Sequence, residues 1–121
     1  MRRLAVAVSG EEVCNHIDKC TGLMIYDIDG KAIVESCFNG YDEDKDSSFV
    51  QLLKKTGVQT LITNGISDQE LLNFKENNID VMSGVIGKAD EIVKKLLKWK
   101  SPWWYAPQML DTNLIFGGAL L

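Results

Sequence analysis

Hydrophobic and polar residues follow two patterns along this chain, one typical of strands and one typical of helices. Residues 3–9 (RLAVAVS) are apolar on both faces, as in a central strand that helices cover from both sides. Residues 22–28 (GLMIYDI) and 32–38 (AIVESCF) are strand-like, and Asp29-Gly30 between them is typical of a tight hairpin, because such turns need positive φ. The first third of the chain is therefore predicted to form a three-stranded meander.

Two capping boxes mark helix starts in the second part of the chain. Ser48 with Gln51, and Ser67 with Glu70, have the spacing at which two side chains satisfy each other's free backbone N–H groups. Gly57 is a typical helix terminator. The sequence therefore predicts one helix between Ser48 and Gly57 and a second helix that begins at Ser67.

The remaining periodic segments complete an alternation of helices and strands. Short apolar runs at 60–63 (TLIT) and 80–84 (DVMSG) predict two further strands. Leu71, Leu72 and Phe74 are expected on one face of the second helix. A third helix is predicted from apolar residues at i, i+3, i+4 and i+7 spacing: Ala89, Ile92, Val93, Leu96 and Leu97.

This order of elements predicts an α/β protein with a five-stranded mixed sheet and helices on both faces. If the meander pairs in sequence, its second strand runs antiparallel to all the others. The fourth and fifth strands then join beside the first through right-handed crossovers. The segments after strands one, four and five meet at one rim, where open α/β sheets favour ligands.

Glycine-containing dipeptides follow each of these three strands at the predicted rim. Their backbone N–H groups could face an anionic ligand at helix N-termini, or the dipeptides could be ordinary tight turns between strand and helix. Both interpretations are kept for Ser9-Gly10, Asn64-Gly65 and Ser83-Gly84.

Residues 13–20 (VCNHIDKC) hold the densest candidate chemistry, because Cys14 and Cys20 flank the only histidine of the chain, His16. Thiolate and imidazole suit iron–sulfur species, copper and zinc. The spacing is not that of a zinc finger, and Cys37, a cluster sulfide or water could complete the ligand set. The structural alternative is that both cysteines are small buried residues and that His16 caps a turn.

Composition narrows the classes of function. The chain of 121 residues has the length of one domain, and its net charge of −4 argues against a nucleic-acid partner, which needs a basic face. Three cysteines without an export signal predict reduced thiols and a cytoplasmic protein, and no stretch reaches the length of a membrane span. No nucleophile elbow, phosphate-binding loop or dinucleotide fingerprint is present, so we predict no enzyme.

The runs LAVAVS, NHIDKCTGLMIYDIDGKAIVE, LLKKTGVQTLITNGIS and NIDV occur in this order between about Arg3 and Lys98. They resemble the dinitrogenase iron–molybdenum cofactor biosynthesis family, also called nitrogenase accessory factor-like proteins. The resemblance implies a ribonuclease H-like, three-layer α/β/α fold. It also implies noncatalytic binding or carriage of iron–molybdenum cofactor, its precursor, or a related molybdenum–copper or iron–sulfur cluster, with cofactor-biosynthesis proteins as partners.

The same resemblance assigns roles to residues of the loop. His16 and Cys20 match the histidine and cysteine of the family's loop, and Lys19 keeps its positive charge, whereas Ile17 and Asp18 depart from the pattern. His16 and Cys20 are therefore the first expected cluster or metal contacts and Cys14 the next. The residues expected to line the rim are Ser9, Gly10, Asn64 and Gly65.

The resemblance divides the chain into a domain over residues 1–100 and a tail over 101–121. The tail is apolar and aromatic, with both prolines and one charged residue. Such a segment is expected to pack on its own domain, on a second subunit as a homodimer, or on another partner. This supports an alternative function, a protein-interaction or regulatory module that acts through the tail and whose metal loop is vestigial.

Overall fold

The computed structural model describes residues 2–41 and 49–98. The predicted capping residue Ser48 and the predicted tail therefore lie outside the described residues. The elements follow in chain order as β1 (Arg2–Ser9), β2 (Glu12–Val13), the 3-10 helix η1 (Ile17–Lys19), β3 (Gly22–Asp29), β4 (Ala32–Gly40), α1 (Phe49–Thr56), β5 (Thr60–Ile62), α2 (Asp68–Glu76), β6 (Asp80–Met82) and α3 (Ala89–Leu97).

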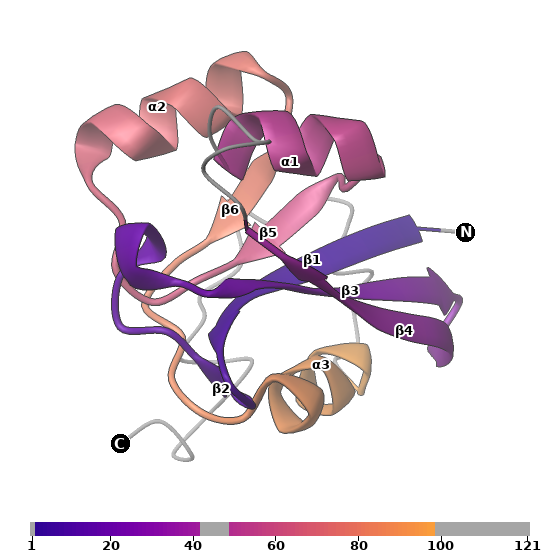
Figure 1. The fold of residues 1–121 in the computed structure, drawn as a ribbon. Helices are drawn as coiled ribbons and strands as arrows, with labels where there is room; N and C mark the ends of the chain where they lie inside the picture. The colour runs from indigo at the N-terminus through magenta and orange to yellow at the C-terminus, as the bar shows by residue number, and fades with distance from the viewer. Residues whose placement is uncertain (1, 42–48, 99–121) are drawn as a thin grey trace.

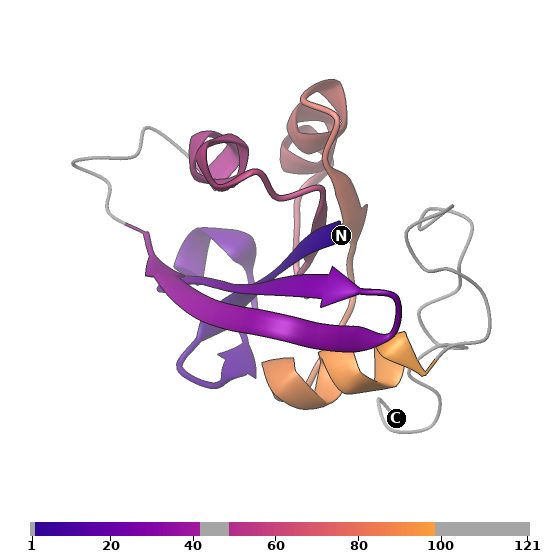
Figure 2. The same ribbon diagram turned by 90° about the vertical axis from the view of Figure 1, so that its right-hand side faces the viewer.

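The sheet has the predicted order and directions. Its strands lie in the order β4-β3-β1-β5-β6, with β3 antiparallel to both of its neighbours and with β1, β5 and β6 mutually parallel. Helices α1 and α2 cover one face and α3 covers the other, so the protein has three layers (Figures 1 and 2). The predicted α/β class is confirmed.

The strand count differs from the prediction by one short element. β2 pairs antiparallel with the end of β1, with Val8 opposite Val13, so the sheet has six strands rather than five. The turn between them contains Gly10 with a positive φ of 68°. A two-residue strand is too short to produce a periodic pattern, which is why the sequence did not indicate it.

The core is divided between the two faces of the sheet, and β1 contributes to both. Its larger side chains, Leu4, Val6 and Val8, pack toward α3, while Ala5 and Ala7 face α1 and α2. All five residues are at most 1% exposed. Burial on both faces explains the continuous apolar run of this strand.

The helices confirm most of their predicted patterns. The capping box of α2 is present: the Ser67 hydroxyl accepts the Glu70 N–H at 3.2 Å, and the Glu70 carboxylate accepts the Ser67 N–H at 2.9 Å. Leu72 was wrongly placed on the buried face, because it is 50% exposed while Phe74 is buried. Two residues span about 200° of a helix, so these side chains point in nearly opposite directions. All five apolar residues predicted for α3 are buried.

Polar contacts fix β3 to its neighbours on both faces. The hydroxyl of Tyr26 donates to Asp90 in the first turn of α3. Burial, and to a smaller extent this hydrogen bond, raises the pKa of Tyr26 above its usual 10.0. Arg3 Nε donates to Asp27 Oδ1 at 2.7 Å, and Arg3 Nη1 donates to the Thr56 carbonyl at 2.6 Å. The hydrogen bond from Arg3 lowers the pKa of Asp27.

No helix within 2–41 and 49–98 is long and apolar enough to cross a membrane.

Candidate functional site

The cysteine–histidine loop lies between β2 and β3, and β1 holds both of its ends. The Cys14 N–H donates to the Ala7 carbonyl at 3.1 Å, and the Thr21 N–H donates to the Val8 carbonyl at 2.9 Å. These bonds place the loop at the carboxyl end of β1. The loop therefore lies at the rim that the sequence predicted.

The middle of the loop is bound to the segment that follows β5. The Ile17 N–H donates to the Gly65 carbonyl, and the Gly65 N–H donates to the Asn15 carbonyl, both at 3.0 Å. A Cβ atom on Gly65 would lie 2.6 Å from the Asn15 oxygen and 3.0 Å from His16 Cδ2. Glycine is therefore required here for the close approach of two backbones, and this approach brings His16 and Gly65 together.

Cys14 and Cys20 are joined by a disulfide across the loop. Their Cα atoms are 5.5 Å apart, a usual distance for a disulfide, and the two residues are 4% and 8% exposed. The prediction of reduced thiols is wrong for this pair, whereas Cys37 is free. The number of cysteines could not reveal this pairing. The pairing depends on how the loop between two cysteines six positions apart folds back at the end of β1.

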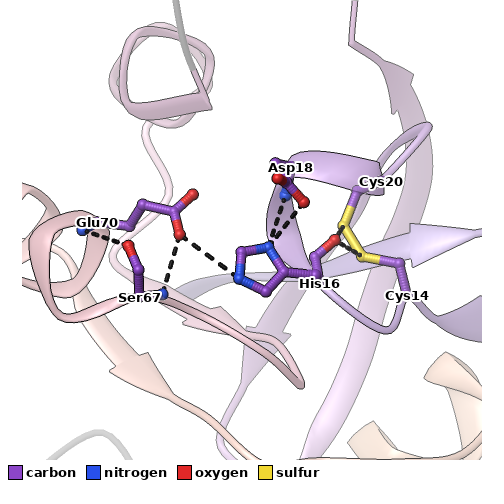
Figure 3. Close-up of polar contacts among 6 residues, drawn as sticks. All are labelled: Cys14, His16, Asp18, Cys20, Ser67 and Glu70. Atoms are coloured by element: carbon purple, nitrogen blue, oxygen red, sulfur yellow. Dashed lines mark hydrogen bonds and ion pairs between the residues drawn. A yellow bond between two sulfur atoms is a disulfide. The ribbon is translucent and has the colours of Figure 1, made fainter.

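The imidazole of His16 points away from the two sulfur atoms (Figure 3). Its Nδ1 lies 2.7 Å from Asp18 Oδ1, and its Nε2 lies 3.8 Å from Glu70 Oε1. The short distance to a carboxylate favours a proton on Nδ1. The Asp18 N–H lies 3.4 Å from the same nitrogen and can bond it only in the other tautomer.

The three predicted ligands therefore do not converge on one point. Cys14 and Cys20 lie in the core cluster beneath α1 and α2, while 37% of the His16 side chain is exposed. The His16 carbonyl accepts the Lys19 N–H at 2.9 Å and closes the first turn of η1, which fits the structural alternative for this residue. Within the described residues, no group of three or more histidine, cysteine or acidic side chains is placed to hold a metal ion.

Two of the three rim dipeptides use their glycine N–H groups inside the protein. The Gly65 N–H bonds the loop, and the Gly84 N–H donates to the Asn64 carbonyl at 2.8 Å. Gly84 has a positive φ of 75°, as a tight turn requires. These contacts hold the segments after β5 and β6 beside each other.

Ser9 and Gly10 occupy a different position from the one predicted. They enter the β1–β2 hairpin instead of leading into a helix, so the expectation of a helix N-terminus at this dipeptide is wrong. Gly10 lines a cavity of ≈ 350 Å³ on the α3 side, together with Lys88 and Asp90. The predicted rim is therefore divided between the two faces of the sheet.

Cys37 lies apart from the loop. It is exposed on the edge strand β4, pairs with Ile25, and precedes Gly40, the last residue of this strand, by three positions. At the rise of a β-strand, this separation corresponds to about 10 Å. Cys37 thus belongs to the strand, as the sequence favoured.

Sequence reasoning missed the acidic surroundings of His16. Glu70 was identified only as a capping residue, yet the oxygen that caps Ser67 is also the one closest to His16 Nε2. Asp18 was noted only as a departure from the family pattern. The histidine–x–aspartate spacing was a usable signal for that contact, whereas the approach of α2 depends on the tertiary structure.

Comparisons with known proteins agree with this fold. The family model described as dinitrogenase iron-molybdenum cofactor matches residues 1–98, and the chain belongs to this family. No curated protein matches the chain by sequence.

Solved structures that are similar at low sequence identity share the fold. PH0822 is 20% identical, with 84% of this chain and 97% of that one covered and a TM-score of 0.73. A Methanocaldococcus jannaschii protein provisionally described as a dinitrogenase is 18% identical, with coverages of 83% and 96% and a TM-score of 0.66. The apo form of the orange protein from Desulfovibrio gigas is 19% identical, with coverages of 84% and 92% and a TM-score of 0.63.

Proposed function

We propose that this protein binds and carries a preassembled metal–sulfur cluster of the iron–molybdenum cofactor type, without catalysing a reaction on it. Membership of the dinitrogenase iron–molybdenum cofactor family supports a role connected with that cofactor. One observation carries the proposal further. The fold places two sulfur atoms, those of Cys14 and Cys20, side by side at the carboxyl end of β1.

Two neighbouring thiolates are a suitable anchor for such a cargo. Once reduced, Cys14 and Cys20 can ligate one iron, copper or molybdenum atom, because all three form stable bonds to sulfur. A preassembled cluster brings sulfide ligands of its own, so it needs few protein donors. A bare zinc ion in a structural site would need four.

His16 is a separate proposed contact on the outer side of the loop, because its imidazole points away from the two sulfur atoms (Figure 3). With the proton on Nδ1 held by Asp18, Nε2 keeps a lone pair that can ligate a metal. Asn64 and Gly65 would shape this side of the rim. Ser9 and Gly10 belong to the hairpin turn on the α3 side and form no part of the proposed site.

The charges around His16 favour attachment through sulfur. Asp18 and Glu70 lie on either side of the imidazole, so an anionic cluster that approached Nε2 would meet two carboxylates. Lys19 is the exposed cation within the loop. We therefore assign the main binding energy to Cys14 and Cys20 and a smaller share to His16.

The proposed carrier is cytoplasmic and exchanges its cargo with proteins that assemble the cofactor. Anaerobic purification after reduction, with elemental analysis and a visible absorption spectrum, tests this function. The variant Cys14→Ala/His16→Ala/Cys20→Ala is compared with Cys37→Ala, which removes a thiol outside the loop. Molybdenum, iron or copper should be retained by the wild type and by Cys37→Ala, and lost from the triple variant. Equal metal in all three proteins would place the binding site elsewhere.

A further inference from the structure

We propose that the Cys14–Cys20 disulfide is a reversible redox switch for the loop. In the disulfide state the two sulfurs are bonded to each other, so neither can act as a thiolate ligand. Reduction gives two adjacent thiols, which release their protons when they together bind one thiophilic metal. This inference rests on the proposed function only for the identity of the metal cargo.

The loop is built so that reduction need not unfold it. Its ends are bound to β1 and its middle to Gly65 through backbone hydrogen bonds of 2.9 to 3.1 Å, none of which involves a sulfur atom. Ile17, between the two cysteines, is 1% exposed and packs in the same core cluster as they do. The two thiols would therefore stay close together after the bond is broken.

The reduced state also has a ready partner for its protons. The carbonyl oxygen of His16 lies 3.4 Å from Cys14 Sγ and 3.5 Å from Cys20 Sγ (Figure 3). Neither sulfur carries a proton in the disulfide, but in the dithiol each S–H could donate to this oxygen. The same backbone geometry thus accommodates both oxidation states.

The redox step requires a dithiol reductant such as a thioredoxin-type protein or dithiothreitol. A thiolate of the reductant attacks one sulfur of the Cys14–Cys20 bond and forms a mixed disulfide, and its second thiolate then displaces the protein sulfur. The reductant is oxidised to its own disulfide. Two electrons and two protons pass to the protein, which leaves one thiol on each cysteine.

Counting reactive thiols tests the switch without any metal. The native protein is equilibrated with dithiothreitol or with oxidised glutathione, quenched by denaturation with an alkylating reagent, and weighed by mass spectrometry. Cys37, free in the structure, serves as an internal reference. We expect one adduct per chain after oxidation, three after reduction, and one again after reoxidation. Three adducts per chain under every condition would overturn the proposal. So would a count that stays at one in the native protein and increases only when the protein is denatured in the presence of reductant.

Cadmium tests the ligand state of the loop. In a Cys37→Ser background, Cd²⁺ alone is added to the oxidised and the reduced protein, and the ultraviolet sulfur-to-cadmium charge-transfer band is measured. The reduced protein should bind one Cd²⁺ per chain at least tenfold more tightly than the oxidised protein. Equal binding in both states would refute the switch. The variant Cys14→Ser, tested in parallel, should show weak binding under both conditions.

Tetrathiomolybdate, added in the same two states, separates the switch from the proposed function. Suppose that Cd²⁺ binding depends on oxidation state but tetrathiomolybdate is retained in neither state. This outcome would support the switch and count against the cluster cargo. Retention of tetrathiomolybdate regardless of oxidation state would support the cargo and contradict the switch.

Discussion

The two faces of the sheet hold their rim loops through backbone hydrogen bonds to different partners. On the α2 face, the cysteine–histidine loop is bound to Gly65 through two backbone hydrogen bonds. On the α3 face, the β1–β2 hairpin is held by the Ala89 N–H, which donates to the Glu11 carbonyl at 3.0 Å, and Tyr26 bonds Asp90 nearby. Within the described rim, cysteine sulfurs and imidazole occur only on the first side. Loops at the carboxyl ends of the strands therefore do not form one site merely because they lie at the same rim.

The largest effect is expected from Gly65→Ala, which breaks the backbone bridge of the α2 face. A new Cβ would meet the Asn15 oxygen at 2.6 Å, and that oxygen is backbone and cannot move alone. We expect the free energy of unfolding to fall by about 2 kcal/mol, measured by urea denaturation. The single imidazole signal of His16 in the NMR spectrum should also shift.

Gly40→Ala is the matched control for this substitution. A Cβ on Gly40 would make only an ordinary contact of 3.6 Å with Phe38, and this glycine needs no positive φ. Its unfolding free energy should change by less than about 0.5 kcal/mol. Similar losses in both variants would contradict a special role for Gly65.

Tyr26→Phe tests the polar contact on the α3 face. Loss of a hydrogen bond to a carboxylate should lower stability by about 1.5 kcal/mol. The raised pKa of Tyr26 stabilises the wild type below pH 10.0, and this contribution is lost as the pH rises further, since the unfolded chain ionises first. The wild type should therefore lose more stability above that pH than the variant.

Tyr41→Phe supplies the comparison for Tyr26→Phe. The Tyr41 ring is stacked on Phe49 at a centroid distance of 4.3 Å, and the substitution keeps the ring. Denaturation curves for this variant should overlay those of the wild type near neutral pH. A loss as large as that of Tyr26→Phe would assign the effect to the ring environment rather than to the hydrogen bond with Asp90.

Asp27→Asn should have a smaller, pH-dependent effect. Because 43% of the Arg3 side chain is exposed, we expect a loss of about 0.5 kcal/mol at neutral pH. The lowered pKa of Asp27 means that its contribution is complete above the ordinary value of 3.8 and disappears as the pH falls through the lower folded value. A difference between wild type and variant that grows on acidification would exclude this ion pair as its cause.

Glu70→Gln should have the smallest effect and concerns binding. Glutamine can still accept the Ser67 N–H, so the capping box is kept, while one negative charge 3.8 Å from His16 Nε2 is removed. Affinity of the reduced protein for tetrathiomolybdate should rise about twofold at moderate salt. Glu76→Gln, at the other end of α2, should leave it unchanged, and equal increases would point to net charge alone.

Much of the fold could be predicted because it depends on patterns that repeat over several residues. The apolar run of β1 indicated burial on both faces, and the spacing of Ser67 and Glu70 located the start of α2. β2 was missed because two residues carry no period. The hairpin at Gly10 was then mistaken for a turn into a helix.

The candidate site was only partly predictable. Strand order alone brought the loop and Gly65 to one rim, and this inference needed no side-chain positions. The pairing of Cys14 with Cys20 and the direction of the His16 ring depend on local backbone geometry within a short aperiodic loop. The same three residues could equally have converged on a metal, so their spacing could not decide between the two arrangements.

The most direct test of cluster binding at this loop is protection of its thiols from alkylation. Reduced protein would be labelled with and without bound tetrathiomolybdate, and modification of each cysteine followed by peptide mass spectrometry. We expect bound molybdenum to slow labelling of Cys14 and Cys20 at least tenfold and to leave Cys37 unaffected. Unchanged labelling rates at all three cysteines, with molybdenum demonstrably bound, would contradict the assignment of the loop as the binding site.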